Sequence, residues 1–282
     1  MNVQWYPGHM TKARRLLNQD ISLVDIVIEL LDARIPYSSK NPDIDKLASQ
    51  KRRIIALNKH DLADPRKTSV WVKYYKDKGF SVIETDSVSG KGMDTIAELA
   101  RLLMRDKAER QKSRGRILSS IRAMVVGVPN VGKSTLINKY TGSASAKAAD
   151  KPGVTRGKQW IRIREGFELL DTPGILWPKF DDKNVGLNLS FTGAIDDRIL
   201  DRIEIAEAFI SLMRKTAPAA VKTRYKIDFE DEAPYEILEK IARARGFLLR
   251  GSRLDTERAA IVLLDEFRAG KLGRITLEEP DD

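Results

Sequence analysis

Short apolar runs alternate with longer, more polar stretches along the first part of the chain. The apolar runs are rich in Ile, Val and Leu and predict buried strands; they lie at residues 24–31, 53–57, 80–84 and 121–126. The stretches between them predict helices; they lie near residues 42–49, after Pro65, at 92–110 and at 135–140. Strands that alternate with helices predict an α/β fold with a mostly parallel sheet covered on both faces.

The pattern changes in the second half of the chain. Two short runs at residues 159–164 and 167–170 flank a turn signal and predict a hairpin. The remaining apolar stretches predict helices near residues 185–194, 203–215, 234–244 and 256–269. We therefore expect an α/β domain over residues 1–178 and a small all-α domain over residues 179–282.

Composition narrows the class of protein. The 282 residues include no cysteine, which excludes disulfides, thiolate metal sites and a cysteine nucleophile. No stretch approaches the ~20 apolar residues that span a membrane, and the N-terminus lacks the hydrophobic core of a signal peptide. These features predict a cytoplasmic protein with no membrane partner.

Positive charge is concentrated in the first part of the chain. Residues 1–179 hold 33 Lys and Arg against 19 Asp and Glu, whereas residues 180–282 hold 17 against 21. The two parts sum to the net charge of +10. Such a field favours a polyanionic partner such as nucleic acid, although a solvated, soluble surface would have the same charge.

A phosphate-binding loop follows the predicted strand at 121–126. Residues 127–135 read GVPNVGKST, the pattern G-x-x-x-x-G-K-[S/T], and a predicted helix comes next. This context directs backbone N–H groups at one anion, brings Lys133 to the β- and γ-phosphates and offers the Ser134 hydroxyl to Mg²⁺. The sequence therefore predicts a nucleoside triphosphate site; its expected contacts are Asn130, Val131, Gly132, Lys133, Ser134 and Thr135.

A second motif selects the base. Asn58, Lys59, His60 and Asp61 end the predicted strand at 53–57. The Asp61 carboxylate accepts hydrogen bonds from the N1–H and the 2-amino group of guanine, whereas adenine would leave this charge unpaired, at a cost of about 2–4 kcal/mol. Asn58 is expected to fix the loop and touch the base, and the Lys59 stem is expected to pack on it. Asp86 and Ser87, in the loop after residue 84, are expected on the base side.

A third motif completes the nucleotide site. Asp171 is expected to hold Mg²⁺ through a water, and the Gly174 N–H is expected to meet the γ-phosphate. Thr155, in a loop of turn-forming composition, is the expected second hydroxyl ligand of Mg²⁺. In most GTPases the base motif follows the phosphate loop, but here it precedes it. This order predicts a circularly permuted P-loop GTPase domain.

The motifs together resemble the circularly permuted GTPases, and specifically the RbgA/YlqF family of bacterial ribosome-biogenesis GTPases. The resemblance spans nearly the whole chain and rests on WYPGHM at 5–10, DARIP at 32–36, NKHD at 58–61, GVPNVGKST at 127–135, PGVT at 152–155 and DTPGILWPK at 171–179. It implies a cytoplasmic GTPase that binds ribosomal RNA and precursors of the large ribosomal subunit late in assembly. Off the ribosome we expect a monomer. The base-side loop departs from the usual Ser-Ala-Lys, since it reads Ser87-Val88-Ser89.

The resemblance also bears on catalysis. Ile175 follows Gly174, where many GTPases carry a glutamine that orients water. Similar proteins have an N-terminal histidine suspected of this role, and His9 matches it. Asn130 matches the asparagine of K⁺-stimulated GTPases, so K⁺ joins Mg²⁺ as an expected cofactor.

Two functions from different classes remain open. In the first, GTP hydrolysis times the release of the protein from a ribosomal precursor. In the second, the protein is a GTP-dependent RNA-binding scaffold whose turnover is incidental, and Ile175 gives this alternative its support.

Overall fold

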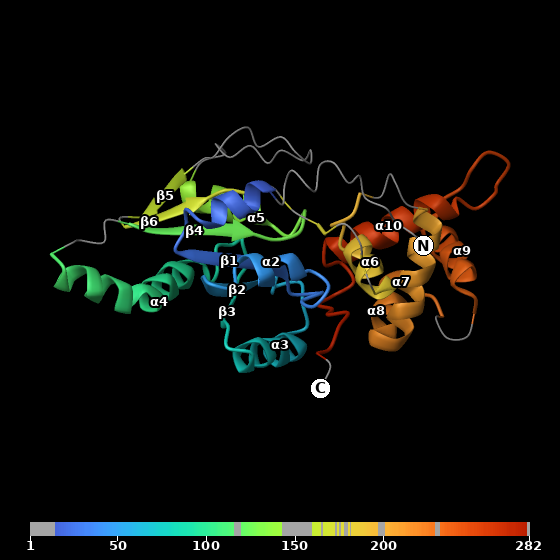
Figure 1. Ribbon diagram of the computed structural model, residues 1–282. Helices are drawn as coiled ribbons and strands as arrows, with labels where there is room; N and C mark the ends of the chain where they lie inside the picture. The colour runs from blue at the N-terminus through green and yellow to red at the C-terminus, as the bar shows by residue number, and fades with distance from the viewer. Residues whose placement is uncertain are drawn as a thin grey trace.

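The computed structural model describes residues 15–115, 120–142, 160–164, 166–172, 174, 176–177, 180, 182–196, 201–228 and 232–280. Figure 1 shows a sheet-containing half joined to a helical half. None of the helices in the described part of the chain has both the length and the apolarity needed to cross a bilayer. Residues His9, Thr155 and Ile175 lie outside the described residues.

Six strands form one sheet in the order β3-β2-β1-β4-β6-β5. All neighbouring strands pair in parallel except β5 and β6, which form the expected hairpin. The strands are β1 (Ile26–Asp32), β2 (Arg52–Asn58), β3 (Ser81–Glu84), β4 (Ile121–Val126), β5 (Trp160–Arg164) and β6 (Phe167–Leu170). The prediction of a mostly parallel sheet is confirmed.

Helices cover the two faces of the sheet, and the alternation along β1 determines which helix each residue meets. Ile26 and Ile28 pack with the apolar residues of α4 (Met93–Ser113) and α5 (Lys133–Thr141). Val27, one residue out of phase, packs with α2 (Pro42–Leu47) on the opposite face. Leu31 shares that face with α3 (Pro65–Asp77). Because both faces are covered, β1 is buried along its whole length, as an apolar run without alternation indicates.

Within the residues that the structure describes, the helical half contains the four predicted helices and one more. Its helices are α6 (Lys183–Phe191), α7 (Arg202–Thr216), α8 (Pro218–Tyr225), α9 (Pro234–Arg245) and α10 (Thr256–Arg268). Phe209 of α7 contacts Phe191 and Phe267 with ring centroids 5.2 and 4.9 Å apart. After α10 the chain returns to the sheet half, where Ile275 to Leu277 are buried. The domain boundary at residue 178 stays a prediction.

Candidate nucleotide-binding site

The predicted nucleotide motifs meet at one edge of the sheet. Strands β1, β2, β3, β4 and β6 run parallel, so their carboxyl ends share this edge. The base motif follows β2, the phosphate loop follows β4 and Asp171 follows β6. Ligands of such sheets bind beyond the carboxyl ends of the strands. The permuted chain order therefore still brings the three motifs together.

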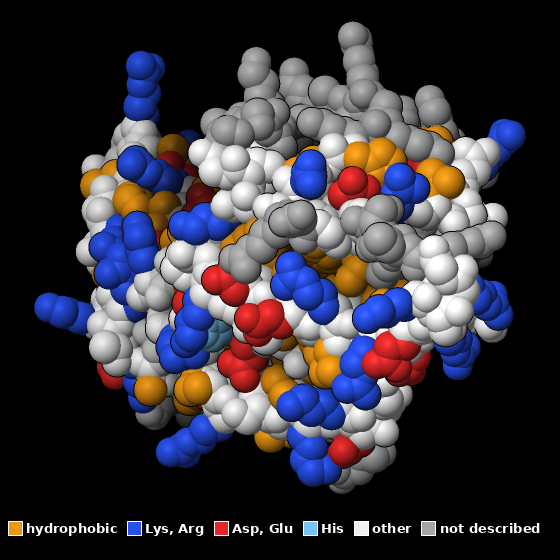
Figure 2. All heavy atoms as spheres, turned by 90° about the vertical axis from the view of Figure 1, so that its left-hand side faces the viewer, with side chains coloured by type: hydrophobic (Ala, Val, Ile, Leu, Met, Phe, Trp, Pro, Cys, Tyr) orange, Lys and Arg blue, Asp and Glu red, His pale blue; other side chains and the backbone are white. Residues whose placement is uncertain are grey.

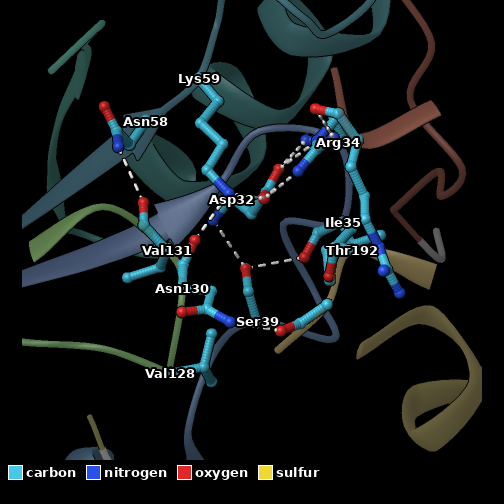
Figure 3. A network of polar contacts seen from close by, with 12 residues as sticks. Asp32, Arg34, Ile35, Ser39, Asn58, Lys59, Val128, Asn130, Val131 and Thr192 are labelled. Carbon is cyan, nitrogen blue, oxygen red and sulfur yellow. Dashed lines mark hydrogen bonds and ion pairs between the residues drawn. The ribbon is translucent and has the colours of Figure 1, made fainter. Parts of the chain in front are cut away.

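Asn58 joins the base motif to the phosphate loop (Figure 3). This side chain is 1% exposed, and its Nδ2 donates a hydrogen bond to the Val131 carbonyl at 2.8 Å. Its Oδ1 accepts from the Ser87 backbone N–H at 3.0 Å and from the Ser87 hydroxyl at 2.8 Å. One amide thus connects three loops from β2, β3 and β4.

Glycine is required where the phosphate loop passes Asn58. A Cβ on Gly132 would lie 2.4 Å from Asn58 Nδ2, and the φ of Gly132 is 107°, in the region that favours glycine. Gly132 is the N-cap of α5, so the loop leads directly into the N-terminus of that helix. Unpaired backbone N–H groups at a helix N-terminus suit an anion such as phosphate.

Lys133 is buried close to Asp171. Its Nζ donates to the carbonyls of Gly127 at 3.0 Å and Val128 at 2.7 Å. Desolvation lowers the pKa of Lys133 to about 7, against the opposing effect of Asp171. Burial likewise raises the pKa of Asp171, despite nearby Lys133. Desolvation disfavours the charged forms of both groups, so Lys133 is suited to pair with a phosphate and Asp171 with a cation.

Gly174 lies close to the phosphate loop. A Cβ on Gly174 would lie 3.0 Å from both Lys133 Nζ and Pro129 Cα, tighter than ordinary contacts. The preceding Thr172 holds this segment to β4, since its hydroxyl donates to the Val125 carbonyl at 2.5 Å. The segment that carries Asp171 therefore adjoins Lys133, as the sequence predicts.

A buried ionic group lies between the base motif and the phosphate loop (Figure 3). Lys59 Nζ donates to Asp32 Oδ2 at 3.0 Å and to the Asn130 carbonyl at 2.7 Å. Arg34 donates to both oxygens of Asp32, at 2.9 and 2.8 Å. Burial alone would raise the pKa of Asp32, but Arg34 and then Lys59 hold that pKa well below its usual range. Desolvation lowers the pKa of Lys59.

Asp32 and Arg34 appeared in the sequence only as part of a family motif, and no role was predicted for them. Asp32 ends β1 at the same sheet edge as the nucleotide motifs, and its carboxylate is 3% exposed. The sequence signal was a charged residue at the end of a mostly apolar strand.

The remaining predicted residues of the nucleotide site differ in their exposure and contacts. Asp61 is exposed, and among the described residues none hydrogen-bonds its carboxylate. His60 is buried and its N–H donates to the Thr85 carbonyl at 3.3 Å. Asp86 Oδ1 accepts the N–H groups of Val88 at 2.8 Å and Ser89 at 3.2 Å, which shapes its own turn. Val131 is buried, Ser134 half-buried and Thr135 exposed.

Asn130 connects the phosphate loop to the helical half. It adopts a φ of 56°, and its Nδ2 donates to the Gly193 carbonyl beyond α6 at 2.6 Å. The Arg34 guanidinium makes a second connection, because it donates at 3.2 Å to the carbonyl of Arg268 at the end of α10. Side chains at the nucleotide site thus touch the ends of two helices.

Among the described residues, Ser134 and Asp171 offer oxygen donors for a cation. Within the described ranges, no group of three or more His, Cys, Asp or Glu side chains forms a metal site. The Ser134 hydroxyl and the Asp171 carboxylate are the hard donors that Mg²⁺ prefers, and Mg²⁺ typically takes one or two such ligands with phosphates and waters. The donor set therefore fits the Mg²⁺ of a nucleotide.

Several known proteins are similar to this chain. The family described as 50S ribosome-binding GTPase matches residues 122–242. Ribosome biogenesis GTPase A of Bacillus cereus is 45% identical over 282 residues, which cover 100% of this chain and 95% of the relative. Its counterpart from Thermotoga maritima is 35% identical and covers 99% of this chain and 95% of the relative.

Solved structures are similar over the same length. The GDP-bound structure of YlqF aligns with a TM-score of 0.71 at 29% identity and covers 95% of this chain and 100% of the other. The GNP-bound YlqF from T. maritima aligns with a TM-score of 0.68 at 30% identity, covering 96% and 99%. Relatives of this identity over the whole chain show that the protein belongs to the ribosome biogenesis GTPase A family of circularly permuted GTPases.

Proposed function

We propose that the protein is a GTP-hydrolysing assembly factor that binds precursors of the large ribosomal subunit and promotes their late maturation. The observation that carries this proposal is the meeting of base motif and phosphate loop at one sheet edge, joined through Asn58 and Val131. The printed names of the relatives supply the ribosomal context. In this proposal the protein acts in the cytoplasm, where ribosomal subunits assemble. The free protein is a monomer.

Asp61 reads guanine in this proposal. The exposed, unpaired carboxylate is available to accept the N1–H and the 2-amino group of the base. Asp61→Asn turns one acceptor into a donor, so affinity for GTP should fall and affinity for XTP should rise. Competitive binding of GTP, ATP and XTP measures this, and an unchanged GTP affinity in the variant rules the assignment out.

The phosphates and the metal lie at the N-terminus of α5. Lys133 pairs with the β- and γ-phosphates, and nucleotide contacts come from Asn130, Val131, Gly132, Ser134 and Thr135. Ser134 and Thr155 would hold Mg²⁺ directly, Asp171 would hold it through a water, and the Gly174 N–H would meet the γ-phosphate. When bound, Mg²⁺ would neutralise part of the negative charge of the phosphates.

Positioning of the attacking water falls to His9 in this proposal, because Ile175 has no polar group to offer it. An imidazole that orients water by one hydrogen bond is sufficient, since phosphoryl transfer demands positioning and electrostatics more than a strong base. Asn130 is the proposed K⁺ ligand. Its Nδ2 donates to the Gly193 carbonyl, so its Oδ1 is the atom that would bind the ion.

Basic surface supports the ribosomal RNA partner. Figure 2 shows many Lys and Arg side chains projecting from the face at the sheet end of the molecule, including its left and lower edges. Helix α4 extends along this end (Figure 1), and its exposed residues include Arg101, Arg105, Arg110 and Lys112. Such side chains pair with phosphates and release counterions.

Co-sedimentation with ribosomal particles tests the proposal. The protein is mixed with large-subunit precursors in GDP and in a non-hydrolysable GTP analogue. A higher bound fraction with the analogue supports a GTP-controlled assembly factor. An equal bound fraction in both nucleotides favours the scaffold with incidental turnover.

A further inference from the structure

The last described residues of the chain return from α10 to the base motif. Figure 1 draws this return segment, residues 270–280, in red between the two halves and ending near α3. Leu272, Ile275 and Leu277 are buried. A Cβ on Gly270, at a φ of 71°, would lie 2.7 Å from Leu62 Cδ2, so the segment approaches the base motif closely from its start.

Arg274 of the return segment spans the loop that carries Asp61. Its Nη2 donates to the His60 carbonyl at 2.8 Å, and its Nε donates to the Ala63 carbonyl at 2.8 Å. The two carbonyls flank Asp61 in the chain. Because a guanidinium is a rigid, planar fork of donors, it fixes the separation of both carbonyls at once.

The neighbouring residues continue this contact. Ile275 N–H donates to the Leu62 carbonyl at 3.0 Å, and the Thr276 hydroxyl oxygen accepts the Asp64 N–H at 3.1 Å. The backbone on both sides of Asp61 is therefore held by one short stretch of distant sequence, whereas the Asp61 side chain remains exposed.

The segment is anchored independently further on. Leu277 N–H donates to the Arg34 carbonyl at 2.8 Å. The Glu278 carboxylate accepts from Tyr37 N–H at 2.8 Å and from Asn188 Nδ2 at 2.9 Å. Truncation of Arg274 should consequently leave the segment in place and change only the support of the loop.

We propose that Arg274 is a positioning residue for guanine recognition, which it supports by holding the Asp61 loop in its binding geometry. The proposal rests on the proposed role of Asp61. That carboxylate must meet two donors of guanine at once, and hydrogen bonds weaken steeply as their angles depart from linearity. A loop released at His60 and Ala63 would misalign this two-bond contact, which includes the bond to the 2-amino group.

Nucleotide affinities of Arg274→Ala test this role. GDP carries the 2-amino group and inosine diphosphate lacks it, so the ratio of their dissociation constants reports that contact. We expect the dissociation constant for GDP to rise about tenfold, or about 1.4 kcal/mol, and the preference for GDP over inosine diphosphate to shrink several-fold. In hydrolysis assays KM for GTP should rise while kcat at saturation stays unchanged.

Lys271→Ala is the matched control. It removes one positive charge from the same segment at an exposed position, and no described residue pairs with that ammonium. It should keep wild-type affinity and preference. An equal loss of GDP affinity in both variants would show that only charge matters and would overturn the positioning role. The role would also be overturned if Arg274→Ala weakened the binding of GDP and of inosine diphosphate equally.

Two further variants keep the test decisive. Arg274→Lys retains the charge but not the fork, so its preference for GDP should lie between those of wild type and Arg274→Ala; a wild-type preference overturns the role even if the alanine variant fails to fold. Asp61→Asn in the same assay separates the two claims. If Asp61→Asn loses the preference for GDP while Arg274→Ala keeps it, only the proposed role of Arg274 is ruled out. If Asp61→Asn keeps the preference, the proposed role of Asp61 falls as well.

Discussion

At the scale of single residues, Asn58 contributes more to the site than its place in a base motif implies. The amide donates to the Val131 carbonyl and accepts from Ser87, so both of its ends are used inside the protein. Such fully satisfied buried polar groups specify one arrangement of the loops around them. Contact with the base is a further, proposed role.

Asn58→Asp should destabilise the nucleotide-free protein by about 3 kcal/mol. The substitution preserves shape, but it directs a carboxylate oxygen at the Val131 carbonyl in a place that is 1% exposed. Urea unfolding measures the change. Asn18→Asp, at an exposed position, is the control for the added charge and should lie within about 0.5 kcal/mol of wild type. Equal stabilities of the two variants would contradict this account of Asn58.

Lys133 should make nucleotide binding dependent on pH. With its pKa lowered to about 7, most of this lysine is neutral at pH 8 in the free protein. Bound phosphates favour the ammonium, so binding takes up a proton and affinity for GDP falls as pH rises above 7, by up to about tenfold per pH unit.

Calorimetric titration with GDP at pH 8, in two buffers of different ionisation enthalpy, measures this proton uptake. We expect uptake of most of one proton per nucleotide. Lys133→Arg keeps its charge throughout, so any binding that it retains should show no uptake. Identical heats in both buffers for the wild type would exclude a lowered pKa of Lys133.

Sequence motifs single out residues whose chemistry is local, but they do not reveal partners that are distant in the chain. Lys133 and Asn58 are recognised because a short motif fixes their neighbours. Arg274 lies 214 residues beyond its acceptor His60, and no local pattern connects the two. Arg34 likewise meets the carbonyl of Arg268 only in the folded chain.

At the scale of elements, Arg34 ties the end of β1 to the end of α10. Its guanidinium binds Asp32 and also donates to the Arg268 carbonyl, where the helix dipole is negative. Arg34 itself is 1% exposed, so each of these bonds is made in a poorly solvated place.

Arg34→Met should destabilise the protein by about 3–5 kcal/mol, because it leaves a buried carboxylate without its bidentate partner. Combining it with Asp32→Asn should cost clearly less than the sum of the two single changes in urea unfolding. Arg52→Met is a matched control on the surface, where the pair with Asp106 is long, at 3.6 Å, and should change stability by less than about 0.5 kcal/mol. Strict additivity of the first two changes would contradict the pairing.

The helices and strands show which parts of the fold the hydrophobic pattern can predict. Every predicted strand and the β5–β6 hairpin are present, because apolar runs and turn residues determine them locally. Helix α8 was missed: of its eight residues only Val221 and Tyr225 are buried, too few for a helical period to be recognised. Its place depends on tertiary contact, since the Tyr225 hydroxyl donates to Glu266 of α10 at 2.8 Å.

At the scale of the whole molecule, exposed arginines of the helical half are further candidates for contact with the ribosomal RNA of the proposed function. Arg245 pairs with Glu266, and the Arg258 guanidinium stacks on Phe247. Arg250 and Arg253, in the exposed loop between α9 and α10, remain available for phosphates.

Arg250→Ala/Arg253→Ala should weaken binding to large-subunit precursors. Each lost phosphate contact removes one released counterion, so the slope of log affinity against log salt should fall by about 2. Lys73→Ala/Lys76→Ala, an equal change of charge on exposed positions of α3, is the control and should leave that slope nearly unchanged. The same slope in wild type and in the arginine variant would remove this loop from the binding surface.

The most direct test of an assembly GTPase is GTP turnover at saturating GTP, measured with and without large-subunit precursors. We predict that the particles raise turnover on the order of 10²-fold, and that His9→Ala abolishes most of this rise while GTP affinity stays the same. Equal turnover with and without particles would contradict the proposal that ribosomal precursors control hydrolysis.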